Sequence, residues 1–157
     1  RWERTKPMGS TRTPDSDRAE LVREVEQAEP FWVAHLDGRA AGYLILKRMD
    51  LHPTTGFIQD IFVDRSCRKR GVASALVEAM KHHAIERGLR GVFWEAQNDN
   101  FEAIELALRR GFVFAGFNDS SYRNGDRDRQ RALDFLGDAV FLYWSAPSAE
   151  AGVRRTL

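Results

Sequence analysis

A strand, a basic loop and a helix follow one another directly in the middle of the chain. Residues 57–63 are mostly apolar, and a run of this kind predicts a strand in the centre of a sheet. After a loop with four basic side chains, apolar residues recur at helical spacing over residues 72–87, at Val72, Leu76 and Met80. A buried strand joined to an amphipathic helix is typical of an α/β fold. The unit therefore favours a mixed α/β sheet.

The remaining segments extend this unit on both sides. Two apolar runs around Asp37 and Gly38 predict a hairpin. Asn100 is a favourable N-cap for a helix over residues 101–110, and Gly111 follows where a left-handed cap is expected. A helix is also expected over residues 15–28, and strands over residues 2–6, 31–34, 42–46, 92–94, 112–114 and 140–144.

The length of 157 residues predicts one domain, with its core over about residues 31–144 and a flexible tail over residues 145–157. The 24 Lys and Arg nearly balance the 23 Asp and Glu, which argues against a dedicated nucleic-acid-binding protein. No apolar run reaches the length of a membrane span, and no signal peptide is visible. The single cysteine, Cys67, excludes an intrachain disulfide and a thiolate zinc cluster. We expect a cytoplasmic monomer or homodimer without a bound metal.

The loop before the central helix combines positive charge with small residues. Arg68, Lys69 and Arg70 precede Gly71, and Ala73 lies in the first helical turn. The free N–H groups and the dipole of a helix N-terminus attract anions, and small residues let a diphosphate approach the backbone. The Walker and Rossmann glycine patterns are absent. A basic loop that only faces solvent is the alternative, but the place between a buried strand and a long helix favours phosphate.

Residues 68–73 also match the signature R/Q-x-x-G-x-G/A. Residues 100–104 match N-x-x-A-I, and Gly111 with Phe112 matches a closing G-F, in the same order and at similar spacing. On these residues the chain resembles the GNAT superfamily of N-acetyltransferases over about residues 31–144. Within the superfamily it looks most like the streptothricin acetyltransferases, on residues 58–61, 95–98, 116–119, 141–144 and Tyr122.

The resemblance implies an acyl-CoA N-acyltransferase fold, which is a mixed, mostly antiparallel central sheet with splayed parallel strands and flanking helices. It also implies acetyl-CoA as co-substrate. The loop and the first helical turn would hold the pyrophosphate, the end of the first splayed strand would bind the pantetheine arm like an added strand, and the Asn would lie near the far end of that arm. The cofactor-binding residues implied in this way are Ile61, Phe62, Val63, Arg68, Lys69, Arg70, Gly71, Val72, Ala73, Ser74 and Asn100.

Two acids are candidates to take the proton of the acceptor amine. Glu95 lies at the end of the second splayed strand, where related ribosomal-protein N-acetyltransferases use a glutamate as base. Asp60 lies on the first splayed strand, and a structural hydrogen-bonding role is its alternative because an unpartnered buried carboxylate is costly. The family's usual general acid is a tyrosine seven residues after the Asn, a position that Ala107 holds here. Tyr122 is the candidate substitute for that acid.

Acidic residues gather away from the basic loop, on residues 15–29 and 119–138. An acidic rim attracts cations, so the expected acceptor is a cationic amine: an antibiotic, a polyamine or a protein amino terminus. The expected function is direct acetyl transfer from acetyl-CoA to such an amine. The alternative is a GNAT-fold protein that binds acyl-CoA for regulation without turnover, which the alanine at position 107 supports.

Overall fold

The structure is a computed structural model, and it describes residues 22, 26, 30–49, 52–118 and 138–147. The predicted tail beyond residue 147, the strand over residues 2–6, Tyr122 and nearly all of the helix over residues 15–28 lie outside the described residues. The described elements are β1 (Phe31–Leu36), β2 (Arg39–Met49), β3 (His52–Val63), the 3-10 turn η1 (Arg65–Cys67), α2 (Val72–Glu86), β4 (Gly91–Gln97), α3 (Phe101–Arg109), β5 (Val113–Asn118) and β6 (Ala139–Ser145).

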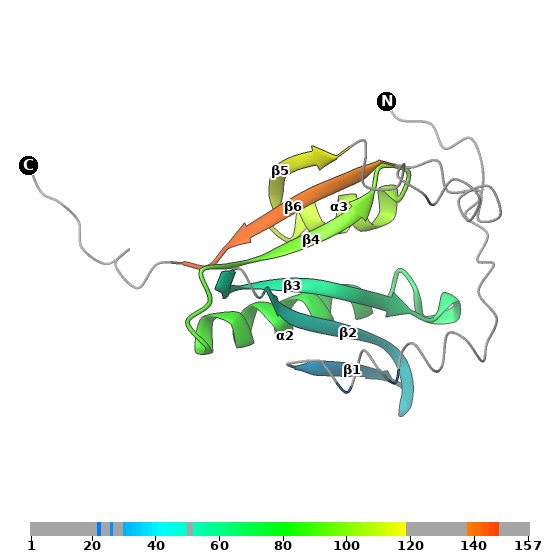
Figure 1. The fold of residues 1–157 in the computed structure, drawn as a ribbon. Coiled ribbons are helices and arrows are strands. Elements are labelled where there is room, and N and C mark those ends of the chain that lie inside the picture. Colours follow the sequence, from blue (N-terminus) through cyan, green and yellow to red (C-terminus); the bar gives the residue numbers. More distant parts are fainter. Residues whose placement is uncertain (1–21, 23–25, 27–29, 50–51, 119–137, 148–157) are drawn as a thin grey trace, which may run out of the picture.

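The strands form one sheet in the order β1-β2-β3-β4-β6-β5. All neighbouring strands run antiparallel except β3 and β4, which run parallel and are joined by a crossover through α2. Figure 1 shows β1, β2 and β3 as one half of the sheet and β4, β6 and β5 as the other. The predicted mixed, mostly antiparallel sheet with one parallel pair is therefore confirmed.

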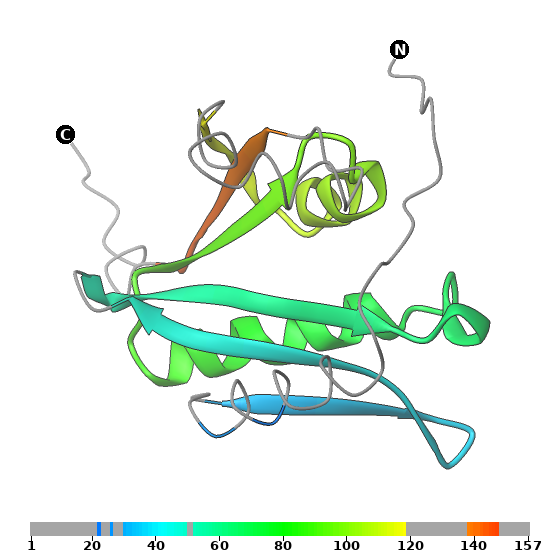
Figure 2. The same ribbon diagram turned by 45° about the vertical axis from the view of Figure 1, so that its right-hand side comes forward.

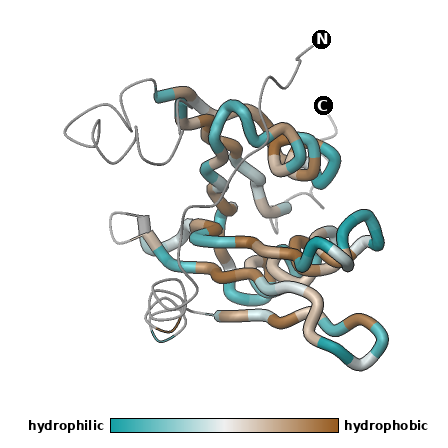
Figure 3. Tube along the Cα trace, turned by 90° about the vertical axis from the view of Figure 1, so that its right-hand side faces the viewer, coloured by the Kyte–Doolittle hydropathy of each residue, from teal (hydrophilic) through white to brown (hydrophobic). Residues whose placement is uncertain are grey.

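Local sequence explains the first hairpin. The turn between β1 and β2 has only two residues between the pair Leu36 and Arg39, and both turn residues, Asp37 and Gly38, have positive φ values of 53° and 76°. Such a turn matches the twist of the flanking strands, and Asp-Gly is one of its preferred sequences. Figure 3 shows this turn as a mainly hydrophilic end of a more hydrophobic hairpin.

One face of the sheet carries the core. The helix α2 packs against β1, β2 and β3, and α3 packs beside β4. The buried stripe of α2 repeats at helical spacing, as the sequence predicts, and consists of Val72, Leu76, Val77, Met80 and Ala84. From the strands, Leu44, Leu46, Ile58, Val92, Trp94 and Leu142 join the same cluster.

A β-bulge changes the direction of side chains in β3. The adjacent β2 residues Leu46 and Ile45 pair with Ile58 and Asp60, so Gln59 is an extra residue on β3. Successive side chains of a strand point to opposite faces of the sheet, so one extra residue moves the side chains that follow it to the other face. Ile58 before the bulge belongs to the core, whereas Asp60 after it lies on the opposite face of the sheet.

Several element boundaries differ from the sequence expectation, and two of the differences have a clear structural cause. Phe112 lies just before β5 and is buried, because the chain turns at Gly111 and its ring packs edge-to-face against Trp94. β4 continues past Glu95 to Gln97, because its pairing with β6 extends to the pair Gln97 and Ala139. Glu95 therefore lies within the strand and not at its end.

Within the described residues, the helices are too short and too polar to cross a bilayer.

Candidate functional site

The parallel strands β3 and β4 separate partway along their length. Their pairing begins at Thr55 with Gly91 and ends at Ile58 with Trp94. Among the described residues no pairing joins the two strands beyond that point, although β3 continues to Val63 and β4 to Gln97. Figures 1 and 2 show the two strands diverging toward their carboxyl ends. We call the space between these ends the split; residues 59–63 of β3 border it.

The N-terminus of α2 lies next to the split, directly after β3 and a short loop. Its N-cap is Gly71, which has a φ of 84° and makes no side-chain capping hydrogen bond. A Cβ at this position would meet nothing within 4 Å, so the backbone is approachable from outside. The first turn of this 15-residue helix thus directs its N–H groups toward space beside the split.

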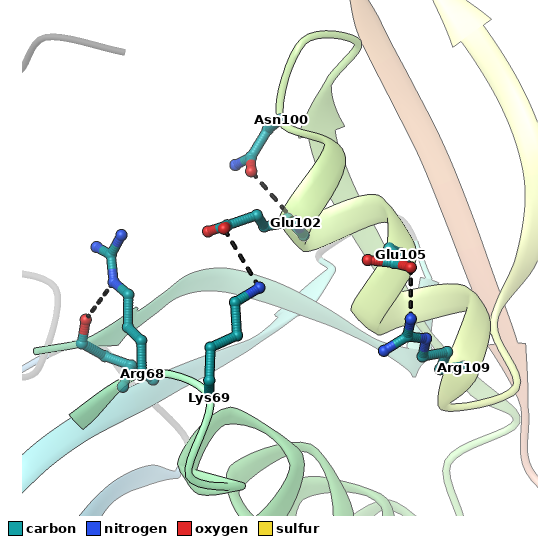
Figure 4. Close-up of polar contacts among 8 residues, drawn as sticks. Arg68, Lys69, Asn100, Glu102, Glu105 and Arg109 are labelled. Atoms are coloured by element: carbon teal, nitrogen blue, oxygen red, sulfur yellow. Dashed lines mark hydrogen bonds and ion pairs between the residues drawn. The ribbon is translucent and has the colours of Figure 1, made fainter. Parts of the chain in front are cut away.

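The basic side chains next to the α2 N-terminus, at positions 68–70, spread in different directions. Arg68 donates from Nε to the carbonyl oxygen of Val63 at 3.1 Å. Arg70 pairs with Asp37 in the β1–β2 turn at 3.0 Å. Lys69 reaches away from α2 toward α3 (Figure 4), where its Nζ lies 3.4 Å from the Oε1 of Glu102. This ion pair connects the loop before α2 with α3.

A small turn sets the start of the loop. Asp64 accepts two hydrogen bonds at Oδ1 from Ser66, one from the hydroxyl at 2.5 Å and one from the backbone N–H at 2.8 Å. These bonds, with a smaller contribution from Arg39 and Arg68, lower the pKa of Asp64 below its usual value despite some desolvation. The ionised carboxylate therefore fixes the 3-10 turn η1 from which the basic loop departs.

Glu95 lies on the face of the sheet that α2 does not cover. Its cross-strand partner in β6 is Phe141, and Phe93 two residues earlier pairs with Tyr143, with ring centroids 4.7 Å apart. Trp94, between the two, points into the core instead. Glu95 is one residue past the last pairing of β4 with β3, so it borders the split and is half-buried.

Asp60 lies on the same face, on the other side of the split. Its carboxylate accepts a hydrogen bond from the hydroxyl of Tyr43 in β2, with 2.7 Å between Oη and Oδ2. This bond provides the partner that a half-buried carboxylate needs, and it agrees with the hydrogen-bonding role that the sequence left as the alternative to base catalysis. Tyr43 itself carried no sequence signal, because the pairing of β2 with β3 brings it there.

Two further positions concern α3. Asn100 caps the helix, because its Oδ1 accepts from the N–H of Ala103 at 3.3 Å. Ala107 is fully buried in the core and carries no group that donates a proton. The cap was foreseen from the sequence. The pairing of Glu102 with Lys69 was not foreseen, because it joins segments 33 positions apart in the chain.

The structure thus gathers the β3 end, the basic loop, the α2 N-terminus and Asn100 around the split, with Asp60 and Glu95 on one face of it. Within the described part of the chain no three His, Cys, Asp or Glu side chains form a group that could hold a metal ion.

Comparison with known proteins identifies a family that this chain matches. The family model for the acetyltransferase (GNAT) family matches residues 1–112. The streptothricin acetyltransferase of Escherichia coli is 30% identical over 87 residues, which make up 55% of this chain and 47% of that protein. The chain therefore spans about half the length of this curated relative.

Solved structures share the fold. A candidate streptothricin acetyltransferase from Bacillus anthracis str. Ames, in complex with acetyl coenzyme A, has a TM-score of 0.62 and 28% identity, and the match covers 73% of this chain and 61% of that one. The ribosomal-protein-S18-alanine N-acetyltransferase of Escherichia coli has a TM-score of 0.69 and 19% identity, covering 92% of this chain and 85% of that one. The second likeness concerns the fold alone.

Proposed function

The chain belongs to the acetyltransferase (GNAT) family, and on this basis we propose that it transfers the acetyl group of acetyl-CoA directly to a primary amine of a cationic small molecule or peptide. The observation that carries the proposal is the split between β3 and β4 beside the uncapped N-terminus of α2. A thioester at the split would meet an amine that arrives from the face with Glu95 and Asp60. A solved relative contains acetyl coenzyme A, which supports this choice of acyl donor.

The residues around the split suit the parts of this co-substrate. Helical N–H groups without a side-chain cap, beside three basic side chains, suit a diphosphate. The edge of β3 over residues 61–63 suits an amide-containing arm, which binds an open strand edge by backbone hydrogen bonds. When bound, acetyl-CoA supplies the acetyl thioester. We therefore propose residues 61–63, 68–74 and Asn100 as its binding residues, with the Asn acting mainly through the helix that it caps.

We assign the general base to Glu95. A primary amine has a pKa of about 10.4, so a group must take its proton for the nitrogen to react at neutral pH. Glu95 takes the ammonium proton directly or through water. The neutral nitrogen then bonds to the acetyl carbon, the carbon–sulfur bond breaks, and the sulfur leaves with its electron pair. The second proton that the nitrogen loses as the amide forms passes to the sulfur or to water. Asp60 is the second candidate, and its hydrogen bond from Tyr43 supports the structural role that is its alternative.

The alternative is a protein that binds acyl-CoA without turnover, and the buried Ala107 is the observation that favours it. The position offers no acid for the departing sulfur. A thiol has a pKa of about 8.5, however, so its anion is a tolerable leaving group, and a general acid contributes about 10²- to 10⁴-fold. Tyr122, outside the described residues, stays the proposed substitute for this acid.

The single cysteine, Cys67, suits a reducing compartment, and we propose the cytoplasm as the location of the protein.

The test is release of free thiol from acetyl-CoA in the presence of a panel of amines, with mass spectrometry of the acetylated products. We expect Glu95→Gln to lower kcat by about 10²- to 10⁴-fold, while the Kd for acetyl-CoA stays close to that of the parent. Glu86→Gln is the control, because Glu86 is exposed at the far end of α2. The control variant should match the parent in both measurements.

The outcomes separate the two candidate functions. Tight acetyl-CoA binding without thiol release for any amine would establish the non-catalytic alternative. Thiol release that Glu95→Gln leaves unchanged would keep the acetyltransferase and remove Glu95 as its base.

A further inference from the structure

The face of the sheet that α2 leaves uncovered is lined with aromatic rings. On the β3 side of the split, the rings of Tyr43 and Phe62 stack with centroids 5.7 Å apart and planes at 26°, and Phe31 lies 5.9 Å from Tyr43. The side chain of Phe62 is 46% exposed, although it is a large apolar group. On the β4 side, Phe93 and Tyr143 continue the same face.

Asp60 is the acidic residue that lies next to these aromatic rings on the β3 side of the split. Its strand register places it on the face that holds Phe62, two residues later, and Tyr43, which pairs with Phe62 across β2 and β3. The hydroxyl of Tyr43 donates to one oxygen of the carboxylate, Oδ2, at 2.7 Å. This bond fixes the direction of the carboxylate. A carboxylate beside stacked aromatic faces attracts an organic cation by charge and by cation–π contact.

The second acid on this face, Glu95, lies across the split. Asp60 is two residues beyond the last pairing of β3 with β4, and Glu95 is one residue beyond it on β4. The two carboxylates therefore border the same end of the split from opposite strands. One of them is the proposed base, and an acceptor amine at that base leaves the other carboxylate available for a second charge on the same molecule.

We propose that Asp60, Tyr43 and Phe62 bind a second cationic group of the acceptor, so that the substrate is a diamine or polyamine. This inference rests on the proposed function, because it concerns the acceptor side of the same reaction. In it, Glu95 takes the proton of the amine that reacts, and Asp60 holds the other ammonium against the ring of Phe62. Tyr43 is a positioning residue that orients the carboxylate of Asp60.

The test compares the parent protein with Asp60→Asn on diamines and on matched monoamines. Putrescine, cadaverine and spermidine are measured against n-butylamine and n-hexylamine, and kcat/KM is recorded for each. We expect the parent to prefer the diamines. We expect Asp60→Asn to reduce the ratio of diamine to monoamine kcat/KM by about 10- to 100-fold, mainly through KM, because a hydrogen bond to a charged group is lost.

Two variants sharpen the result. Tyr43→Phe keeps the ring and removes the hydroxyl, so it should raise KM for diamines by a smaller factor than Asp60→Asn and leave the monoamine values nearer those of the parent. Glu86→Gln removes an acid of α2 far from the split and should leave the ratio unchanged. Far-ultraviolet circular dichroism of each variant checks that it is folded.

The outcomes distinguish this inference from the proposed function. If amines are acetylated but Asp60→Asn lowers kcat equally for monoamines and diamines, Asp60 acts in the chemical step and the inference is wrong. A parent protein that acetylates monoamines and diamines equally well also overturns it. If no amine is acetylated at all, the proposed function fails first.

Discussion

Asp64 shows how a single exposed carboxylate shapes the site. It directly follows the end of β3, and its two hydrogen bonds from Ser66 fix the turn between β3 and the basic loop. The same bonds lower its pKa, with help from Arg39 and Arg68. The charged form is thus the form that stabilises the folded state.

This predicts a pH dependence of stability at the residue scale. An Asp has a pKa of about 3.9 in an unfolded chain, and the pKa of Asp64 is lower in the folded protein, so the unfolded state binds the proton first as pH falls. The contribution is fully present above about pH 4 and is lost as pH falls through the folded value. Asp64→Asn should be less stable than the parent at pH 7.

Urea denaturation of both proteins at a series of pH values measures this effect. The difference between their free energies of unfolding should shrink as the pH drops below about 4. A difference that stays constant or grows toward acid would contradict the assigned role of the Ser66 hydrogen bonds.

At the scale of elements, α2 is a helix with two different ends. It starts at Gly71 and is followed by Gly88, and both glycines have positive φ values, of 84° and 67°. A Cβ would meet nothing within 4 Å at either position. Replacing either glycine by a residue with a Cβ therefore strains the backbone to a similar degree, but only Gly71 lies beside the split.

We expect Gly71→Leu and Gly88→Leu each to lower stability by about 1 kcal/mol, because a left-handed backbone disfavours residues with a Cβ. Only Gly71→Leu should also weaken acetyl-CoA binding, by about tenfold or more, because its side chain obstructs the helical N–H groups. Calorimetric titration with acetyl-CoA measures the affinity, and thermal unfolding measures the stability. Equal affinity in the two variants would remove the α2 N-terminus from the binding site.

At the scale of the whole molecule, the two halves of the sheet meet through few contacts near the split. β3 and β4 pair only over the segment that ends at Ile58 and Trp94, and the pair of Lys69 with Glu102 joins the α2 loop to α3 (Figure 4). The side chains of that ion pair are 78% and 57% exposed, so the pair adds little stability. It does place a negative charge where the phosphates of acetyl-CoA are proposed to bind.

We therefore expect Glu102→Gln to tighten acetyl-CoA binding by about two- to fivefold at low salt, because Lys69 is released and a repulsive charge is removed. The gain should vanish at high ionic strength, where exposed charges are screened. Glu105→Gln is the matched control: Glu105 lies one turn later on α3, pairs with Arg109 and should leave the affinity unchanged.

Calorimetric titration at two salt concentrations decides between the possible roles of Glu102. Weaker binding in Glu102→Gln would mean that Glu102 holds Lys69 in its binding position and does not compete with the phosphates. Equal changes in both glutamine variants would indicate a general charge effect of α3.

Local patterns in the sequence predict most of the helices and strands. They also predict the basic loop before α2, which is the part of the site that one continuous segment forms. The apolar spacing of α2, the Asn100 cap and the Asp37-Gly38 turn depend on neighbours within a few positions, so each was foreseen. The same holds for the basic loop at the start of α2, since its charges and Gly71 are adjacent in the chain. Residue roles in binding and catalysis stay predictions until the variants are measured.

Contacts between distant segments could only be decided by the tertiary structure. The chain contains an acid at position 60, but its partner Tyr43 follows from the register of β2 with β3, and its face follows from the bulge at Gln59. The family resemblance leads us to expect splayed strands, but only the structure shows that the pairing of β3 with β4 ends at Ile58 and Trp94. The sequence by itself determined the elements and the basic, glycine-containing start of α2 that we propose as the anion-binding end, because these follow from local spacing and charge. Strand register, which no local pattern encodes, decided that two carboxylates and a set of aromatic rings share one face beside the split.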